Sequence, residues 1–209
     1  MKKKIIVLII ATALIVAFTF LPQLIPLTGI PGFLFKVSIY LLIAGVAIVG
    51  MILTGIKIDF DIKNKWQYLI GLGIALTISF FAAFLPAMLG HSIVGNHQDF
   101  KWHIFLLDFI FFVLFVGPVE ELAFRVYYQE TFCGFFKSGF KWIGVIIAAF
   151  FFGLWHLING GLFQVCFTFF FGLIFGFAKH FLKNCKYLGL ALGHGVYDFL
   201  NVVVCMFVI

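Results

Sequence analysis

Two adjacent glutamates, Glu120 and Glu121, and an arginine four residues later, Arg125, interrupt the apolar stretch FFVLFVGPVEELAFRVYY. A charged side chain at the centre of a membrane helix costs about 2.5 to 3.5 kcal/mol on insertion scales, so this cluster indicates a function beyond packing. On a helix, Glu121 and Arg125 share a face and can pair, whereas Glu120 points about 100° away. We therefore expect Glu120 to face a cavity. Gly117 and Pro118 just before it permit a kink or a widened turn.

Two further polar motifs lie in apolar segments downstream. Phe152 and His156 form an FxxxH motif. His194 and Asp198 lie four residues apart on one helix face, and Asn201 follows about one turn later on that face. Each motif alone is compatible with a structural role, because a membrane histidine often only hydrogen-bonds a neighbouring helix. Together they add a second acid and two imidazoles on helices other than the one that carries the glutamates.

A carboxylate and two imidazoles on three helices can activate a water molecule. In that case Glu120 takes a proton, His156 orients or shares it, and His194 stabilises an oxyanion. The same three side chains can equally ligate a zinc ion, because two histidines and a carboxylate leave one coordination position open for water. The residue types alone leave both mechanisms open.

The composition predicts an all-α, polytopic membrane protein. Of 209 residues, 64% are apolar and 11% are charged, against about 25% charged in soluble domains. Apolar runs bounded by lysines recur along the chain and predict about seven spans, with the catalytic cavity among the fourth, fifth and seventh. The predicted spans are Ile5–Leu21, Val37–Ile56, Tyr68–Leu89, Ile104–Tyr128, Trp142–Ile158, Leu162–Ala178 and Tyr187–Val208, with a turn over Leu21–Gly32.

These spans divide into motif-free helices over residues 1–103 and a catalytic core over residues 104–209, within one membrane domain. Most lysines fall on one side of the membrane when the N-terminus is cytoplasmic, so the net charge of +6 reflects topology and contact with lipid headgroups, not nucleic acid. The first span follows Lys2–Lys4 but is longer than the apolar region of a signal peptide, so we expect a retained helix.

The three motifs resemble those of the CPBP family of intramembrane proteases, also called the Abi or CAAX-protease-like family. The family pattern is EExxxR, then FxxxH, then HxxxN or HxxxD. This chain carries the motifs in that order, beginning at Glu120, Phe152 and His194, on the fourth, fifth and seventh predicted spans. The resemblance covers residues 104–201, and the first three spans carry none of the motifs.

The resemblance implies a role for each motif residue. Glu120 and His156 would activate the attacking water, His194 would be the oxyanion donor, and Glu121 with Arg125 would support them. The implied activity is an intramembrane endopeptidase that acts on prenylated CAAX-type substrates or, in bacteria, on leader-type secreted peptides and bacteriocins. A composition rich in Phe, Ile and Lys favours a bacterial cell membrane, and with it peptide processing.

Two other classes of membrane protein remain open. One is a bacteriocin immunity or binding protein without catalysis. The other is a proton-coupled transporter, because buried Glu, His and Asp side chains also build proton relays. The seven spans show neither a repeated half nor a pair of broken helices, which are features of many transporters.

The depth of the motif residues is a difficulty for straight helices with these bounds. Glu120 and His194 would lie roughly 10 to 12 Å from the cytoplasmic ends of their spans, but His156 roughly 20 Å from its own. Either the fifth span is tilted or begins deeper than Trp142, with residues 129–141 as an interfacial segment, or the site lies nearer the middle of the membrane. The NGG run at 159–161 would then be a re-entrant turn.

Asp198 departs from the prenyl protease pattern, in which an asparagine donates an amide hydrogen. An ionised aspartate donates nothing, so Asp198 is protonated, orients His194 or ligates a metal. Asn201 is the candidate replacement donor, and we expect Asn201→Ala to reduce cleavage of a peptide substrate. Intact cleavage in Asn201→Ala, together with loss of cleavage in Asp198→Ala, would show that this hypothesis is wrong.

Overall fold

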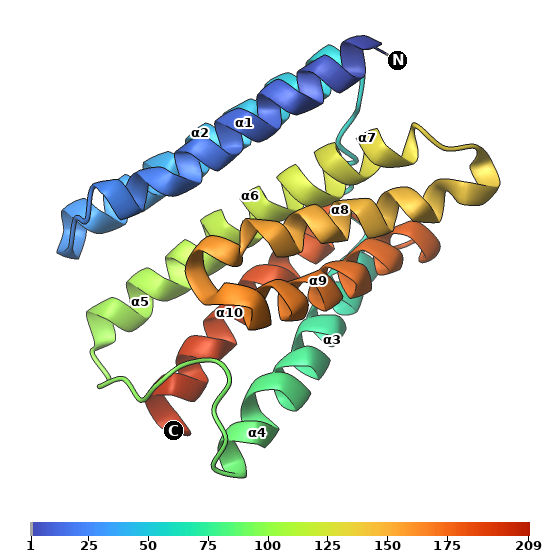
Figure 1. Ribbon diagram of the computed structural model, residues 1–209. Helices are drawn as coiled ribbons and strands as arrows, with labels where there is room; N and C mark the ends of the chain where they lie inside the picture. Colours follow the sequence, from blue (N-terminus) through green and yellow to red (C-terminus); the bar gives the residue numbers. More distant parts are fainter. Residues whose placement is uncertain (1) are drawn as a thin grey trace. The chain divides into compact units, whose positions relative to one another are not determined.

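All regular structure in the described part of the chain is helical (Figure 1). The computed structural model describes residues 2–209, and the side chains of all of these except residues 158 and 159. Seven helices in this range are long and apolar enough to cross a membrane, which confirms the predicted all-α polytopic architecture. They are Lys2–Leu24, Gly29–Thr54, Lys65–Met88, Trp102–Cys133, Ser138–Trp155, Gly160–Phe181 and Tyr187–Phe207.

The first two helices are longer than predicted. Helix α1 covers Lys2–Leu24 and α2 covers Gly29–Thr54, so the predicted turn over Leu21–Gly32 is confined to 25–28. Of the prolines in this run, Pro26 lies in the turn, whereas Pro22 and Pro31 lie near helix ends. Pro31 lies in the first turn of α2, where the backbone N–H groups have no partner within the helix and proline is tolerated.

The helix Trp102–Cys133, here called the long helix, carries the two glutamates and changes its winding along its length. Its segments are α5 (Trp102–Phe111), the π-helical η2 (Phe112–Val116), α6 (Gly117–Glu121), the π-helical η3 (Leu122–Tyr128) and α7 (Gln129–Cys133). Pro118 has no N–H to donate to the preceding turn, and such a break favours a widened turn. The widening expected near Gly117 and Pro118 is therefore confirmed.

Contacts divide the chain into two compact units. Unit 1 comprises the chain up to Phe60 together with Val119–Lys183, and unit 2 comprises Asp61–Pro118 and Asn184–Ile209. The boundary in the long helix falls inside α6. The predicted division at residue 103 separates helices with motifs from helices without them, and not groups of contacts. It stays a prediction.

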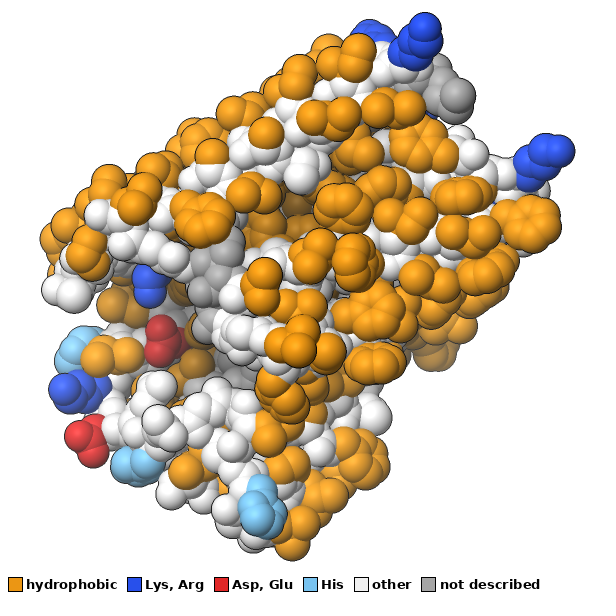
Figure 2. Space-filling model, in the orientation of Figure 1, with side chains coloured by type: hydrophobic (Ala, Val, Ile, Leu, Met, Phe, Trp, Pro, Cys, Tyr) orange, Lys and Arg blue, Asp and Glu red, His pale blue; other side chains and the backbone are white. Residues whose placement is uncertain are grey.

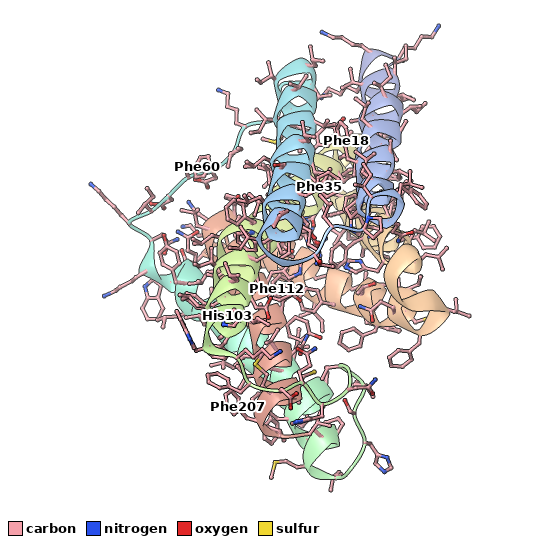
Figure 3. The ribbon with its side chains drawn as sticks, turned by 90° about the vertical axis from the view of Figure 1, so that its left-hand side faces the viewer. Phe18, Phe35, Phe60, His103, Phe112 and Phe207 are labelled. Atoms are coloured by element: carbon pink, nitrogen blue, oxygen red, sulfur yellow. The ribbon has the colours of Figure 1, made fainter. Side chains whose placement is uncertain are left out.

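Unit 1 contains two pairs of neighbouring helices, α1 with α2 and α8 (Lys141–Trp155) with α9 (Leu157–Phe181). The half-buried Phe18 of α1 lies between the first two helices (Figure 3). Helix α2 also packs on η3, where Gly50 leaves room for the ring of Tyr127: a Cβ there would lie 2.6 Å from Tyr127 Cζ. Figure 2 shows mostly hydrophobic side chains along α1 and basic ones at its N-terminal end, as expected of a helix in lipid.

Unit 2 is held together by close backbone contact between α10 (Tyr187–Phe207) and its neighbours. Those neighbours are α3 (Lys65–Ser79), which continues through the π-helical η1 (Phe80–Phe84) into α4 (Leu85–Met88), and the first half of the long helix. A Cβ on Gly71 of α3 would lie 1.8 Å from Gly189 O, and one on Gly117 would lie 2.4 Å from Ala191 O. Glycine at these crossings lets the helix that carries His194 approach both neighbours, as small residues do in membrane proteins.

We expect Gly71→Ala to lower the free energy of unfolding by about 1 to 3 kcal/mol, because the added methyl group overlaps backbone atoms of α10. Gly73 on the same helix is the matched control, since a Cβ there meets nothing within 4 Å. Gly73→Ala should be neutral or stabilise α3 by about 0.5 to 1 kcal/mol, because alanine loses less backbone entropy in a helix. Thermal unfolding of the purified variants in detergent measures both, and equal melting temperatures would contradict the packing argument.

Candidate functional site

Glu120 lies at the centre of a polar cluster inside unit 1. Its side chain is 3% exposed. The hydroxyl of Tyr40, on α2, donates a hydrogen bond of 3.0 Å to Glu120 Oε1. The other carboxylate oxygen, Oε2, lies 3.9 Å from Nε2 of His156, which caps the C-terminus of α8. Two helices of unit 1, α2 and α8, thus place polar groups beside one carboxylate on a third helix.

The backbone decides which nitrogen of His156 carries the proton. Nδ1 lies 2.9 Å from the carbonyl oxygen of Phe152, one turn earlier in α8. A carbonyl oxygen only accepts, so Nδ1 is the donor, and in the neutral imidazole Nε2 is left with its lone pair. That lone pair is on the nitrogen that faces Glu120.

Two acceptor atoms, Glu120 Oε2 and His156 Nε2, therefore face each other across 3.9 Å when Glu120 is ionised and His156 is neutral. This separation is too long for a direct hydrogen bond. It suits a molecule, such as water, that donates one proton to each of the two atoms. A water oxygen at 2.8 Å from each atom would see them at roughly 90°, close to the angle between its two O–H bonds. The arrangement can bind and polarise one water molecule.

The neighbouring Glu121 and Arg125 form the ion pair expected from their spacing. Arg125 Nε lies 3.4 Å from Glu121 Oε2, and both side chains are fully buried. The guanidinium carbon of Arg125 also lies 4.6 Å from the ring centroid of Phe152. A cation over an aromatic face is favourable when desolvated. The pairing prediction is confirmed, and Glu120 is the glutamate left for other contacts.

Phe152 connects the ion pair to the histidine. Its ring lies beneath Arg125, and its backbone carbonyl holds His156 Nδ1. The rings of Phe152 and His156 also meet edge to face, with centroids 4.7 Å apart. The phenylalanine of the FxxxH motif thus has a physical role here, because it fixes the imidazole and receives the cation that pairs with Glu121.

The three polar side chains of the cluster lie at one level along their helices. At 1.5 Å per residue, Glu120 lies roughly 20 Å from the C-terminal end of the long helix, and His156 roughly 22 Å from the start of α8. Tyr40 lies roughly 21 Å before the end of α2. The expected mismatch in depth between Glu120 and His156 came from ending the fourth span at Tyr128. The helix continues through Gln129–Cys133, which therefore do not form a separate interfacial segment.

The chain bends shortly after His156. Helix α8 ends at Trp155, and Gly161 has a φ of 65° and a ψ of −163°, which are not helical values. Glycine suits this position because a Cβ disfavours positive φ. The backbone break expected at the NGG run is present. The Asn159 side chain lies outside the described residues, and the re-entrant character of the turn stays a prediction.

The third motif lies in unit 2, on α10. His194 is 3% exposed, and its Nε2 lies 3.5 Å from Asp198 Oδ2 one turn later. The carboxylate of Asp198 is therefore placed to orient His194. Asn201 lies near the hydroxyl of Tyr197, also one turn apart. Its role as the replacement donor stays a prediction.

The proposed zinc ligands are divided between the two units. Among the side chains that the structure describes, neither unit brings three His, Cys, Asp or Glu residues together. Unit 1 supplies Glu120 and His156, and the third proposed ligand, His194, belongs to unit 2. The zinc hypothesis is not tested by these contacts and still rests on the sequence.

Comparison with known proteins finds a family similar to the segment that carries the motifs. Residues 102–200, just under half of the chain, match the sequence model of the Rce1-like, type II CAAX prenyl endopeptidases. This segment is similar to that family. The match confirms the CPBP resemblance seen in the motifs, and a peptidase of this family acts on a protein or peptide substrate in a membrane. No curated protein and no solved structure matches the chain.

Tyr40 is the contact of Glu120 that sequence reasoning missed. It lies outside the Rce1-like segment and belongs to no motif. With the second span starting at Val37, a tyrosine at this position reads as an interfacial aromatic residue. Because α2 starts at Gly29, Tyr40 instead lies roughly 16 Å along the helix. A tyrosine hydroxyl inside an apolar helix needs a partner, but the predicted start at Val37 concealed that Tyr40 lies inside one.

We expect Glu121→Gln to lower the free energy of unfolding by about 3 to 5 kcal/mol, because Arg125 stays buried and loses its direct counter-ion. The matched control is Glu130→Gln on the same helix, whose partner Lys179 lies at a more exposed site; the loss there should be at most about 1 kcal/mol. Replacing the pair together, as Glu121→Leu with Arg125→Met, should recover much of the lost stability. Unfolding of purified protein in mixed micelles measures all three, and equal losses for the two glutamines would contradict the buried pair.

Proposed function

We propose that Glu120 and His156 together activate a water molecule that hydrolyses a peptide bond near the C-terminus, or in a membrane-adjacent segment, of a lipophilic substrate. The observation that carries this proposal is the pair of acceptors, Glu120 Oε2 and His156 Nε2, at 3.9 Å, with the imidazole proton held on Nδ1 by Phe152. The Rce1-like match of the segment that contains both residues supports an intramembrane CAAX-type endopeptidase.

In the proposed reaction, the water oxygen attacks the carbonyl carbon of the scissile peptide bond while one of its protons passes to Glu120. A C–O bond forms, and the carbonyl oxygen becomes an oxyanion. When the tetrahedral intermediate collapses, the C–N bond breaks and the proton is delivered to the departing amine. Glu120 thus acts first as a base and then as an acid, with His156 holding the water by its second proton.

The roles of the α10 residues are proposed from their place in the motif order. In its doubly protonated form, His194 donates to the oxyanion from Nδ1, while its Nε2–H is directed to the Asp198 carboxylate, which orients the imidazole. Fixed donors of this kind contribute most where water is excluded, and His194 is almost fully buried. Zinc bound by Glu120, His156 and His194 is the competing proposal for how the water is activated.

Two substrate classes follow from the family and the setting. The matched family consists of CAAX prenyl endopeptidases, so a prenylated C-terminal peptide is the first substrate to test. A leader-type secreted peptide is the second, for a chain from a bacterial membrane. With a cytoplasmic N-terminus, the C-terminal ends of α2 and of the long helix face the cytoplasm, and substrates would reach the site from that side.

We expect Glu120→Gln and His156→Ala each to lower kcat/KM by about 10² to 10⁴ on a fluorogenic peptide with a farnesylated C-terminal CAAX sequence. The matched controls are Glu130→Gln on the same helix and His180→Ala near the end of α9, which should keep native turnover. The assay uses protein purified in detergent, with monodispersity checked for each variant. The unprenylated peptide and a leader-type peptide are run beside it.

Unchanged turnover in Glu120→Gln or in His156→Ala would contradict the proposed mechanism. Absence of turnover in the native chain on all three peptides would instead favour a binding or immunity protein. A chelator added to the same assay separates the two ways of activating water: loss of activity that zinc restores supports the metal, and unchanged activity supports the glutamate and histidine alone.

A further inference from the structure

We propose that Tyr40 is a positioning residue of the active site, which orients the Glu120 carboxylate so that Oε2 faces His156. Its consequence for kinetics rests on the proposed function, whereas the contact itself does not. Tyr40 lies on α2, in the part of the chain outside the Rce1-like segment. The site would therefore be completed by a helix that carries no family motif.

The contact is specific to one carboxylate oxygen. The Tyr40 hydroxyl donates to Oε1 at 3.0 Å, and the distance to His156 Nε2 is measured from Oε2. The terminal torsion of a glutamate side chain is broad and roughly two-fold, so a buried carboxylate with one held oxygen has far fewer orientations than an unheld one. Holding Oε1 thus determines where the second oxygen points.

The hydroxyl acts through Glu120 and not on the substrate. A tyrosine has one O–H proton, and in this structure that proton is donated to the carboxylate. It is therefore not available to an oxyanion in the same state. The bond also partly compensates the cost of burying the carboxylate, because a hydrogen bond to a charged acceptor is about twice as strong as one between neutral groups.

The packing of α2 holds Tyr40 at the required level. Ile39, Ile43 and Ala47 form a buried stripe along α2, and Tyr40 lies at its edge. Further along, Gly50 meets the ring of Tyr127 on the long helix so closely that a Cβ would lie 2.6 Å from Cζ. Tyr40 contacts Glu120, and Gly50, further along α2, contacts Tyr127, further along the long helix. The two helices therefore run in the same direction here. The two contacts fix the register of α2 along the long helix.

Tyr40→Phe removes only the hydroxyl and tests the proposal kinetically. We expect kcat on the farnesylated peptide to fall about 10- to 100-fold with little change in KM, because a misplaced base slows chemistry without weakening binding. The matched control is Tyr128→Phe, which removes another hydroxyl that joins two helices of unit 1, to Thr12 on α1 at 2.7 Å. It should keep native kcat and KM. Incorporating 3-fluorotyrosine at position 40, which keeps the donor, should restore kcat.

A spectroscopic measurement tests the contact without any substrate. Subtracting the infrared spectrum of Glu120→Gln from that of the native chain isolates the carboxyl band of Glu120. This band should shift in Tyr40→Phe and stay in place in Tyr128→Phe, because only the first variant removes a hydrogen bond to Oε1. The shift is expected whether or not the peptide is cleaved, so a chain without turnover bears on the proposed function alone.

A loss of kcat in Tyr40→Phe with a shifted carboxyl band, and neither effect in Tyr128→Phe, supports the proposal. An unshifted band overturns it, as does native kcat in Tyr40→Phe. Equal losses in both tyrosine variants also overturn it, because they would show that any lost hydroxyl between helices disturbs the fold to the same degree.

Discussion

The buried ion pair between Glu121 and Arg125 is the interaction on which the rest of the site depends. Two adjacent carboxylates inside an apolar helix both need partners, and Arg125 is directed to one of them. Because its guanidinium is held by Glu121 on one side and by the ring of Phe152 on another, the second carboxylate, Glu120, is left to the polar groups of other helices. Without that division, the arginine could satisfy either acid.

Phe152, on α8, connects the ion pair of the long helix to His156. The ring that receives the cation and the carbonyl that holds His156 Nδ1 belong to the same residue. The orientation of the imidazole is thus tied to the position of the ion pair, and Nε2 faces Glu120 as a result. In this chain the EExxxR and FxxxH motifs are two halves of one packed arrangement.

The winding of the long helix places the glutamates where these contacts are possible. Its α-helical turn at Gly117–Glu121 lies between two π-helical segments, η2 and η3. The first of these, η2, precedes Pro118, whose missing N–H favours a widened turn there. Widened turns change the direction of the side chains that follow them. In unit 2, the position of His194 depends on glycines at the helix crossings. These glycines let α10, which carries His194, pack closely against its neighbours.

The sequence by itself determined the all-α membrane class, the seven spans, the pairing of Glu121 with Arg125 and the family resemblance of the motif segment. Composition and spacings of three or four residues are enough for these, since the residues concerned lie within one helix or one apolar run. Only the tertiary structure decided that Tyr40 reaches Glu120, that Phe152 lies under Arg125, and that Glu120 and His156 lie at one depth. These features depend on where helices end and how they pack, and a shift of five residues in one helix end changes the depth by more than a turn.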